Sequence, residues 1–132
     1  MGQITVDLTA KFDELTKGQN RPQGLAFPRY FTSHLTGGRT PYDEVEWESR
    51  TASIGNDKGA VIFEQRDVEV PSDWSQTATN IVASKYFHGK LGTPERETSV
   101  GQLVHRVVDT IADWGKKGGY FLTAEDAEHF RG

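Results

Sequence analysis

The spacing of apolar residues changes twice along this chain. Residues 1–26 carry only scattered apolar positions among polar ones, and we expect a flexible N-terminal arm there. Beyond Glu44, β-branched and aromatic residues alternate with charged ones, which is typical of strands with one exposed face. The stretch "GNDKG" at 55–59 separates two such runs with residues that tolerate the positive φ angles of a tight turn. The pattern predicts a β-hairpin over about 44–70, ended by Pro71, which cannot donate a hydrogen bond to a strand ladder.

After the hairpin, apolar residues recur at helical intervals in three segments. We predict helices over about 72–88, 94–115 and 123–131. The residues expected to begin them are Ser72, Thr93 followed by Pro94, and Thr123 in a capping box with Asp126. The first helix would bury a face made of Trp74, Ala78, Ile81, Val82 and Tyr86. The second carries the longest apolar stripe of the chain, made of Val100, Leu103, Val104, Val107, Val108, Ile111 and Trp114.

Three aromatic residues surround a proline in "FPRYF", residues 27–31. Aromatic rings gain most when they are buried, so we expect this segment to dock onto a core. The domain therefore begins at Phe27. The whole of 27–132 is predicted to be an α+β domain in which a β-hairpin precedes two or three packed helices.

Composition excludes several classes of protein. A chain of 132 residues suits one domain, and its formal charge of −4 with a pI near 5.5 argues against a nucleic-acid binder, which normally presents a basic face. No apolar run approaches the ~20 residues of a membrane span, and the start lacks the apolar core of a secretory signal, so we expect no membrane contact and a cytoplasmic location. The chain has no cysteine, which rules out a disulfide, a thiolate metal site and a cysteine nucleophile within it.

Candidate chemistry is sparse. The histidines at 34, 88, 105 and 129 show no metal-ligand spacing, and neither a phosphate-binding glycine motif nor a serine nucleophile motif is present. The best candidate for contact is the corner "SKYFHGKLGTPERE", residues 84–97, between the first two predicted helices. Its residues Lys85, Tyr86, Phe87 and Lys90 could hold a phosphate or an acidic partner. Alternatively, the two aromatics pack into the core and the lysines stabilise the helix C-terminus.

The residues alone thus indicate a small α+β unit without predicted catalytic, cofactor-binding or metal-binding residues. Three stretches nevertheless resemble the N-terminal domain of bacterial adenosylcobalamin-dependent (class II) ribonucleotide reductases. They are "PYDEVEWE", "FEQRDVEVPSDWSQTATNIVASKYFHGKLGTPERETSVGQLVHRVVDTI" and "GYFLTAEDAEHF". The resemblance runs from roughly Gly24 to Phe130 and is densest between Trp74 and Ile111.

The resemblance implies a part of a large ribonucleoside-diphosphate reductase that makes deoxyribonucleotides for DNA synthesis by radical chemistry. In that family adenosylcobalamin gives a radical that is passed to a cysteine of a ten-stranded α/β barrel, and further cysteines are reset by a thioredoxin-type reductant. No family catalytic residue has a matching position here, so none is carried over. We expect this cysteine-free chain to be inactive alone, to bind no adenosylcobalamin alone, and to be truncated before the barrel. Its expected partner is that barrel, in the same or a separate chain, and nucleotide and reductant would be reached only through it.

Two other classes of function stay open at this point. A stand-alone, non-enzymatic interaction or regulatory module could keep this domain without the enzyme, and an unrelated partner recovered with the chain would favour it. An independent enzyme that uses the histidines and carboxylates is a third class, but no constellation of residues in the sequence supports it.

Overall fold

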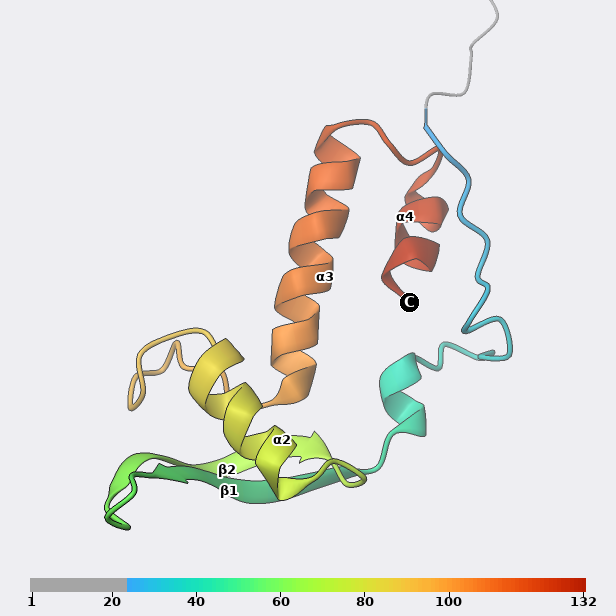
Figure 1. The fold of residues 1–132 in the computed structure, drawn as a ribbon. Coiled ribbons are helices and arrows are strands. Elements are labelled where there is room, and N and C mark those ends of the chain that lie inside the picture. Colours follow the sequence, from blue (N-terminus) through green and yellow to red (C-terminus); the bar gives the residue numbers. More distant parts are fainter. Residues whose placement is uncertain (1–23) are drawn as a thin grey trace, which may run out of the picture.

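The computed structural model describes residues 24–132 (Figure 1). Its elements in chain order are the 3₁₀ turn η1 (Pro41–Glu44), the strands β1 (Trp47–Gly55) and β2 (Val61–Pro71), the helix α2 (Gln76–Ile81), the π-helical turn η2 (Val82–Tyr86), and the helices α3 (Val100–Lys117) and α4 (Ala124–Arg131). The hairpin and α2 form a base, α3 rises from it, and α4 runs back beside the upper part of α3 (Figure 1). The predicted α+β arrangement of a hairpin followed by helices is confirmed.

The hairpin forms where the alternating pattern predicts it. β1 and β2 pair antiparallel, from Trp47 opposite Pro71 to Gly55 opposite Val61. The turn is closed by Asn56, whose side-chain oxygen accepts the backbone N–H groups of residues 58 and 60 at 3.0 and 2.9 Å. Gly59 has a φ of +77°, the left-handed conformation that the glycine in "GNDKG" provides at little cost. Pro71 is the last paired residue of β2, as expected.

A bulge in the hairpin changes which residues of β2 face inward. Arg50 pairs with Val68 and Ala52 pairs with Gln65, so two residues of β2 oppose only one of β1. Asp67 within this bulge has a φ of +54°. Because a strand alternates with period two, the inserted residue moves the inward face from odd to even positions, and Gln65 and Val68 are both buried.

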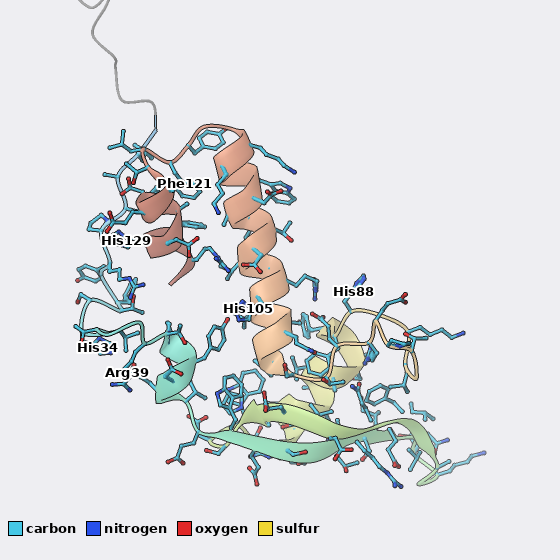
Figure 2. The ribbon with its side chains drawn as sticks, turned by 180° about the vertical axis from the view of Figure 1, so that it is seen from behind. His34, Arg39, His88, His105, Phe121 and His129 are labelled. Carbon is cyan, nitrogen blue, oxygen red and sulfur yellow. The ribbon has the colours of Figure 1, made fainter. Side chains whose placement is uncertain are left out.

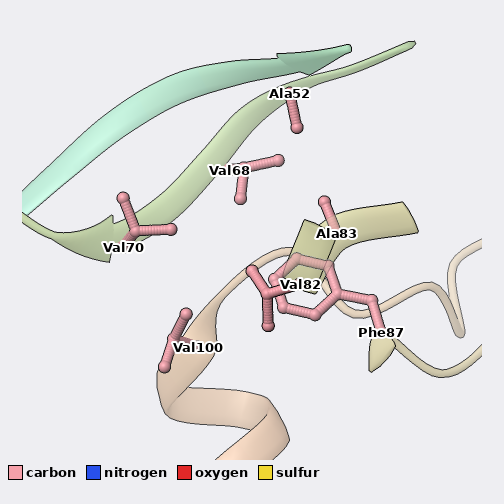
Figure 3. Packing of buried hydrophobic residues seen from close by; sticks show 7 residues of the cluster. All are labelled: Ala52, Val68, Val70, Val82, Ala83, Phe87 and Val100. Atoms are coloured by element: carbon pink, nitrogen blue, oxygen red, sulfur yellow. The ribbon is translucent and has the colours of Figure 1, made fainter. Parts of the chain in front are cut away.

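The core lies between the inner face of the hairpin, η2 and the start of α3 (Figure 3). Its buried apolar members are Ala52, Val68, Val70, Val82, Ala83, Phe87 and Val100. Two alanines with no exposed surface bring η2 close to β1, and the larger rings of Trp47, Phe63 and Trp74 pack around the rim. Full burial of each such valine or phenylalanine contributes about 1.5–3 kcal/mol, so this small cluster is the main source of the domain's stability.

The first helix differs from the prediction in its start and its buried face. It begins at Gln76, with Ser75 as the N-cap accepting the N–H of Ala78 at 3.0 Å, because Ser72 donates its own N–H to Glu46 and so continues the hairpin. The expected face is only partly correct, because Val82 is buried and Trp74 packs against the core but two other members do not. Ile81 and Tyr86 are exposed, and the inward positions are Thr79, Val82, Ala83 and Phe87. Thr79 is tolerated inside because its hydroxyl donates to the carbonyl of Ser75 and accepts from Arg50.

The second helix begins six residues later than predicted. Its N-cap is Ser99, which accepts the N–H of Gln102 at 3.0 Å. Thr93, the expected cap, instead donates its hydroxyl to the carbonyl of Lys90 within a turn. Residues 97–99 stay extended because Glu97 N–H donates to His88 and the carbonyl of residue 98 accepts from Glu69 of β2.

The segment before the hairpin is tied to the last helix. The capping box of Thr123 and Asp126 that begins α4 is confirmed. Phe27 donates its N–H to the carboxylate of Asp126 at 2.8 Å, and its ring meets those of Phe121 and Phe130 edge-on. Docking of "FPRYF" therefore holds for Phe27, whereas the other two aromatics, at 30 and 31, are exposed.

The predicted flexible arm falls almost entirely outside the described residues. Of its 26 positions, only 24–26 are described. Leu25 there forms a parallel bridge with Phe121, with hydrogen bonds of 2.7 and 2.9 Å to the residues on either side of it. The docked part of the chain therefore includes Leu25, which precedes the domain boundary that the sequence pattern placed at Phe27.

Candidate functional site

The corner at 84–97 projects from the junction of η2 and α3 and is held by two arginines. Arg96 reaches back to the end of η2 and donates to the carbonyls of Ala83, Phe87 and Gly89. Its Nε also donates to the side chain of Gln65 on β2 at 3.0 Å. Carbonyls at a helix C-terminus lack partners within the helix, so a guanidinium that binds one carbonyl of η2 and two just beyond it closes the corner onto the sheet.

Glu97 is the second anchor of the corner and is itself buried. Its carboxylate accepts the N–H of His88 at 2.6 Å and two groups of Arg106 on α3, Nε at 3.1 Å and Nη2 at 3.0 Å. Burial raises the pKa of Glu97, but the hydrogen bonds from Arg106 and His88 and the charge of Arg106 outweigh it, so the pKa lies below its usual range. The carboxylate is therefore charged at neutral pH and joins the corner to α3.

Close backbone approach completes this geometry. Gly89 has a φ of +89°, and a Cβ at this position would lie 2.4 Å from the carbonyl oxygen of Glu95. No other residue type fits between the two limbs of the corner without moving one of them. The corner is thus a fixed shape, and the side chains on its outside are presented by a rigid backbone.

The four candidate contact residues of the corner do not share one environment. Lys85 and Lys90 are exposed, and Tyr86 is 64% exposed. Phe87 is buried in the core with 7% exposure, so it offers no free surface, and the alternative in which it packs inward is correct for this residue. His88, also exposed, adds a further basic group at the same edge (Figure 2).

Arg96, Glu97 and Arg106 were not singled out by the sequence reasoning. Their partners lie 7 to 31 residues away, so no local pattern reports them. The one local feature that marks these residues is the charged stretch "PERE" beside a glycine-rich turn, but such a stretch is equally typical of an exposed loop. Lys85 lies in the last turn of η2, and Arg96 adds direct hydrogen bonds to carbonyls at the same end.

The histidines of the described region lie apart from one another. The labelled histidines come from different elements (Figure 2): His34 pairs with Glu44 at 2.8 Å, His105 stacks on Tyr42, and His129 contacts the carbonyl of Phe27. Among residues 24–132, no group of three or more His, Asp or Glu side chains is placed to hold a metal ion. Within the same residues, no helix has the length and apolar character needed to cross a membrane.

Fold and site together define a small α+β domain in which residues 24–132 contain no group of three or more side chains placed to hold a metal ion. Residues 48–132 match the family described as class II vitamin B12-dependent ribonucleotide reductase. That match includes both strands, the corner and the last two helices. The chain belongs to the family of class II vitamin B12-dependent ribonucleotide reductases and corresponds to its N-terminal domain.

Curated relatives agree with this assignment. The chain is 49% identical over 121 residues to a vitamin B12-dependent ribonucleotide reductase of Rhodopirellula baltica, covering 91% of this chain and 11% of that protein. It is 51% identical over 111 residues to the protein of the same name from Streptomyces avermitilis, covering 83% of this chain and 11% of the relative. A third relative, from Bradyrhizobium diazoefficiens, is 34% identical over 131 residues. The chain therefore spans about a ninth of the length of the first two relatives.

No described residue is assigned to the cofactor in the family's name. Four of the surface hollows of residues 24–132 have volumes between about 160 and 470 Å³, and two of them are lined by a histidine. The histidines nearest to them, His105 and His129, are engaged with Tyr42 and the carbonyl of Phe27. No step of cobalamin chemistry is therefore assigned to these residues.

Proposed function

We propose that this chain supplies the N-terminal structural domain of an adenosylcobalamin-dependent ribonucleotide reductase, which converts ribonucleotides to deoxyribonucleotides. The family match over 48–132 carries the proposal, because it covers the elements that build the core and the corner. The rest of the reductase, called here the catalytic remainder, would hold the α/β barrel, the cobalamin, the reactive cysteines and the nucleotide site. It belongs to the same chain or to a separate one.

The contribution of this chain is positioning. The corner presents Lys85, Tyr86 and Lys90 on a backbone fixed by Arg96 and Glu97. We assign these three exposed side chains to contact with the catalytic remainder, where two ammonium groups and an aromatic ring suit an acidic rim around an apolar patch. Nucleotide and thioredoxin-type reductant meet the remainder alone. A cytoplasmic location accompanies this assignment, because ribonucleotides and such reductants are found there.

A chimera tests the proposal. In it, this chain replaces the matching segment of the Rhodopirellula baltica enzyme, and deoxyribonucleotide formation is measured with adenosylcobalamin, a ribonucleotide and a dithiol reductant. We expect the chimera to be active and a version without the N-terminal segment to be inactive. Equal activity in both would show that the domain is dispensable, and an inactive but folded chimera would show that this chain is not an equivalent domain.

Charge reversal at the corner tests its assigned role in the same chimera. Lys85→Glu combined with Lys90→Glu is expected to lower activity at least ~10-fold, since like charges at an interface rim disfavour docking. Lys58→Glu at the exposed hairpin turn is the matched control and should leave activity within about twofold, because an isolated surface charge contributes little. A corner double variant with the activity of the control would remove the corner from the contact surface.

A further inference from the structure

The apolar stripe of α3 is covered by this domain along only part of its length. Val100, Leu103 and Val104, near the base, belong to the core or pack against it. Higher on the helix, Val107 and Ile111 are each 43% exposed and Trp114 is 64% exposed. These three residues, called here the open face of α3, lie farther along the helix than the residues that the base covers.

The open face continues the buried stripe without a change of direction. Val100, Val104, Val107, Ile111 and Trp114 follow one another at intervals of four, three, four and three residues. On a helix this spacing keeps side chains in one narrow row. The exposed upper residues are therefore part of the same row as the covered lower ones.

The last helix does not cover this row. α4 packs on another side of α3, where Ala112 and Gly115 are buried and Asp109 pairs with Arg131. Trp114 lies nearly opposite Asp109 and Ala112 around a helix of 3.6 residues per turn. Within residues 24–132, a tryptophan and two branched aliphatic side chains are thus left in contact with solvent, an arrangement that marks an interaction surface.

The spacing and the surroundings indicate what covers the open face. Intervals of three and four residues over two heptads are those with which one helix packs along another, whereas a strand offers a period of two. The corner, which carries the exposed residues Lys85, His88 and Lys90, lies beside the lower end of α3 (Figure 1), so the partner would carry acidic residues at that end. About nine tenths of the length of the related reductases lies outside the part matched by this chain, which provides the partner.

We propose that the open face of α3 binds an amphipathic helix of the catalytic remainder, with Trp114 as its main anchor; this inference rests on the proposed function. Large aromatic side chains in such positions carry most of the affinity of an interface. The docked helix would extend the core of the hairpin up along α3 and fix the direction in which α3 leaves the base.

Hydroxyl-radical footprinting of Trp114, read by mass spectrometry, tests the inference in the chimera and in the 132-residue chain alone. We expect the reactivity of Trp114 in the chimera to be about fivefold lower, as its exposed 64% becomes covered at an interface centre. Ile111→Asp in the chimera should restore that reactivity to within about twofold of the lone chain, because a buried carboxylate without a partner disfavours docking. Ile62→Asp, at an isoleucine of the hairpin tip that is 67% exposed, is the matched control and should leave Trp114 protected.

The outcomes separate the two proposals. An active chimera in which Trp114 stays as reactive as in the lone chain, or in which both aspartate variants behave alike, overturns the docking inference and leaves the proposed function standing. An inactive, folded chimera counts against the proposed function itself. Circular dichroism of each variant establishes that α3 is still formed.

Two other occupants of the open face are distinguished in the lone chain. Protection of Trp114 that rises with protein concentration would assign the surface to a second copy and overturn the inference. Protection that disappears when residues 1–23 are deleted would assign it to this chain's own N-terminal segment and overturn it as well. The inference requires Trp114 to be reactive in the lone chain at every concentration, with and without those residues.

Discussion

Replacing Glu97 by glutamine tests the physical basis of the corner. The carboxylate accepts two groups of Arg106 and the N–H of His88, and its side chain is only 10% exposed. Hydrogen bonds to a charged group are worth about 1.5–3 kcal/mol each. Arg106 is 40% exposed and regains water when its partner is neutralised, and glutamine keeps one acceptor. We therefore expect Glu97→Gln to lower the free energy of unfolding by about 2 kcal/mol at pH 7.

The pH dependence of this loss identifies its origin. Because the pKa of Glu97 in the folded protein lies below its unfolded value of about 4.3, the charged form stabilises the fold fully above that value. As the pH falls below about 4.3 and then through the folded pKa, Glu97 is protonated and the wild type loses this contribution, whereas the glutamine variant has none to lose. The difference in unfolding free energy between the two proteins should therefore shrink towards pH 3.

Urea denaturation followed by tryptophan fluorescence at pH 7, 5, 4 and 3 measures this difference. The matched control is Glu64→Gln, whose partner Arg66 is 78% exposed, and it should change stability by less than about 0.5 kcal/mol at every pH. A Glu97→Gln loss that is equally large at pH 7 and pH 3 would refute the reasoning, because it would then arise from shape and not from the ionised carboxylate.

Three further substitutions probe separate parts of the fold. Val68→Ala should cost about 2–3 kcal/mol in urea denaturation, since Val68 has no exposed surface and a cavity would remain. Gly89→Ala should lower the free energy of unfolding by more than about 2 kcal/mol, because the added Cβ would overlap the carbonyl of Glu95. The control is Gly92→Ala, which has a similar φ of +82° but open space around it and should cost about 1 kcal/mol. Similar losses for the two variants would show that overlap is not the cause. Thr123→Ala removes the N-cap of α4 and should cost about 1 kcal/mol, seen as faster hydrogen exchange in α4 with unchanged exchange in the hairpin.

Features governed by neighbouring residues were predictable from the sequence. The turn at Asn56 and the capping box of Thr123 each depend on side chains within four residues, and both occur where the sequence places them. The apolar stripe of α3 also persists from Val100 to Trp114, because helical periodicity is a property of a single segment. These elements needed no knowledge of what the rest of the chain does.

Features governed by distant partners were not predictable. Thr93 and Pro94 form a favourable helix start, but the helix is delayed to Val100 because Arg96 and Glu97 are held by groups of η2, β2 and α3. The bulge at Asp67 exchanges the inward and outward faces of β2. It depends on the register between β1 and β2, which cannot be predicted from the alternation within one strand. For the same reason the sequence left two environments open for Phe87, contact with a partner or packing into the core, since the π-helical turn that carries it inward depends on the core beneath.

The open face of α3 shows the limit of periodicity as an indicator of structure. Apolar residues at intervals of three and four indicate that a helix buries one side, but they do not indicate whether the surface that covers this side belongs to the same domain. Here Val100 and Trp114 obey the same pattern, yet one is 5% exposed and the other 64%. Because an exposed tryptophan adds little to the stability of a lone domain and much to an interface, we attribute the upper half of the stripe to the proposed docking and not to folding of this domain. The chain matches about a ninth of its relatives' length, and under this proposal Trp114 is the residue whose exposure should differ most between the lone chain and the assembly.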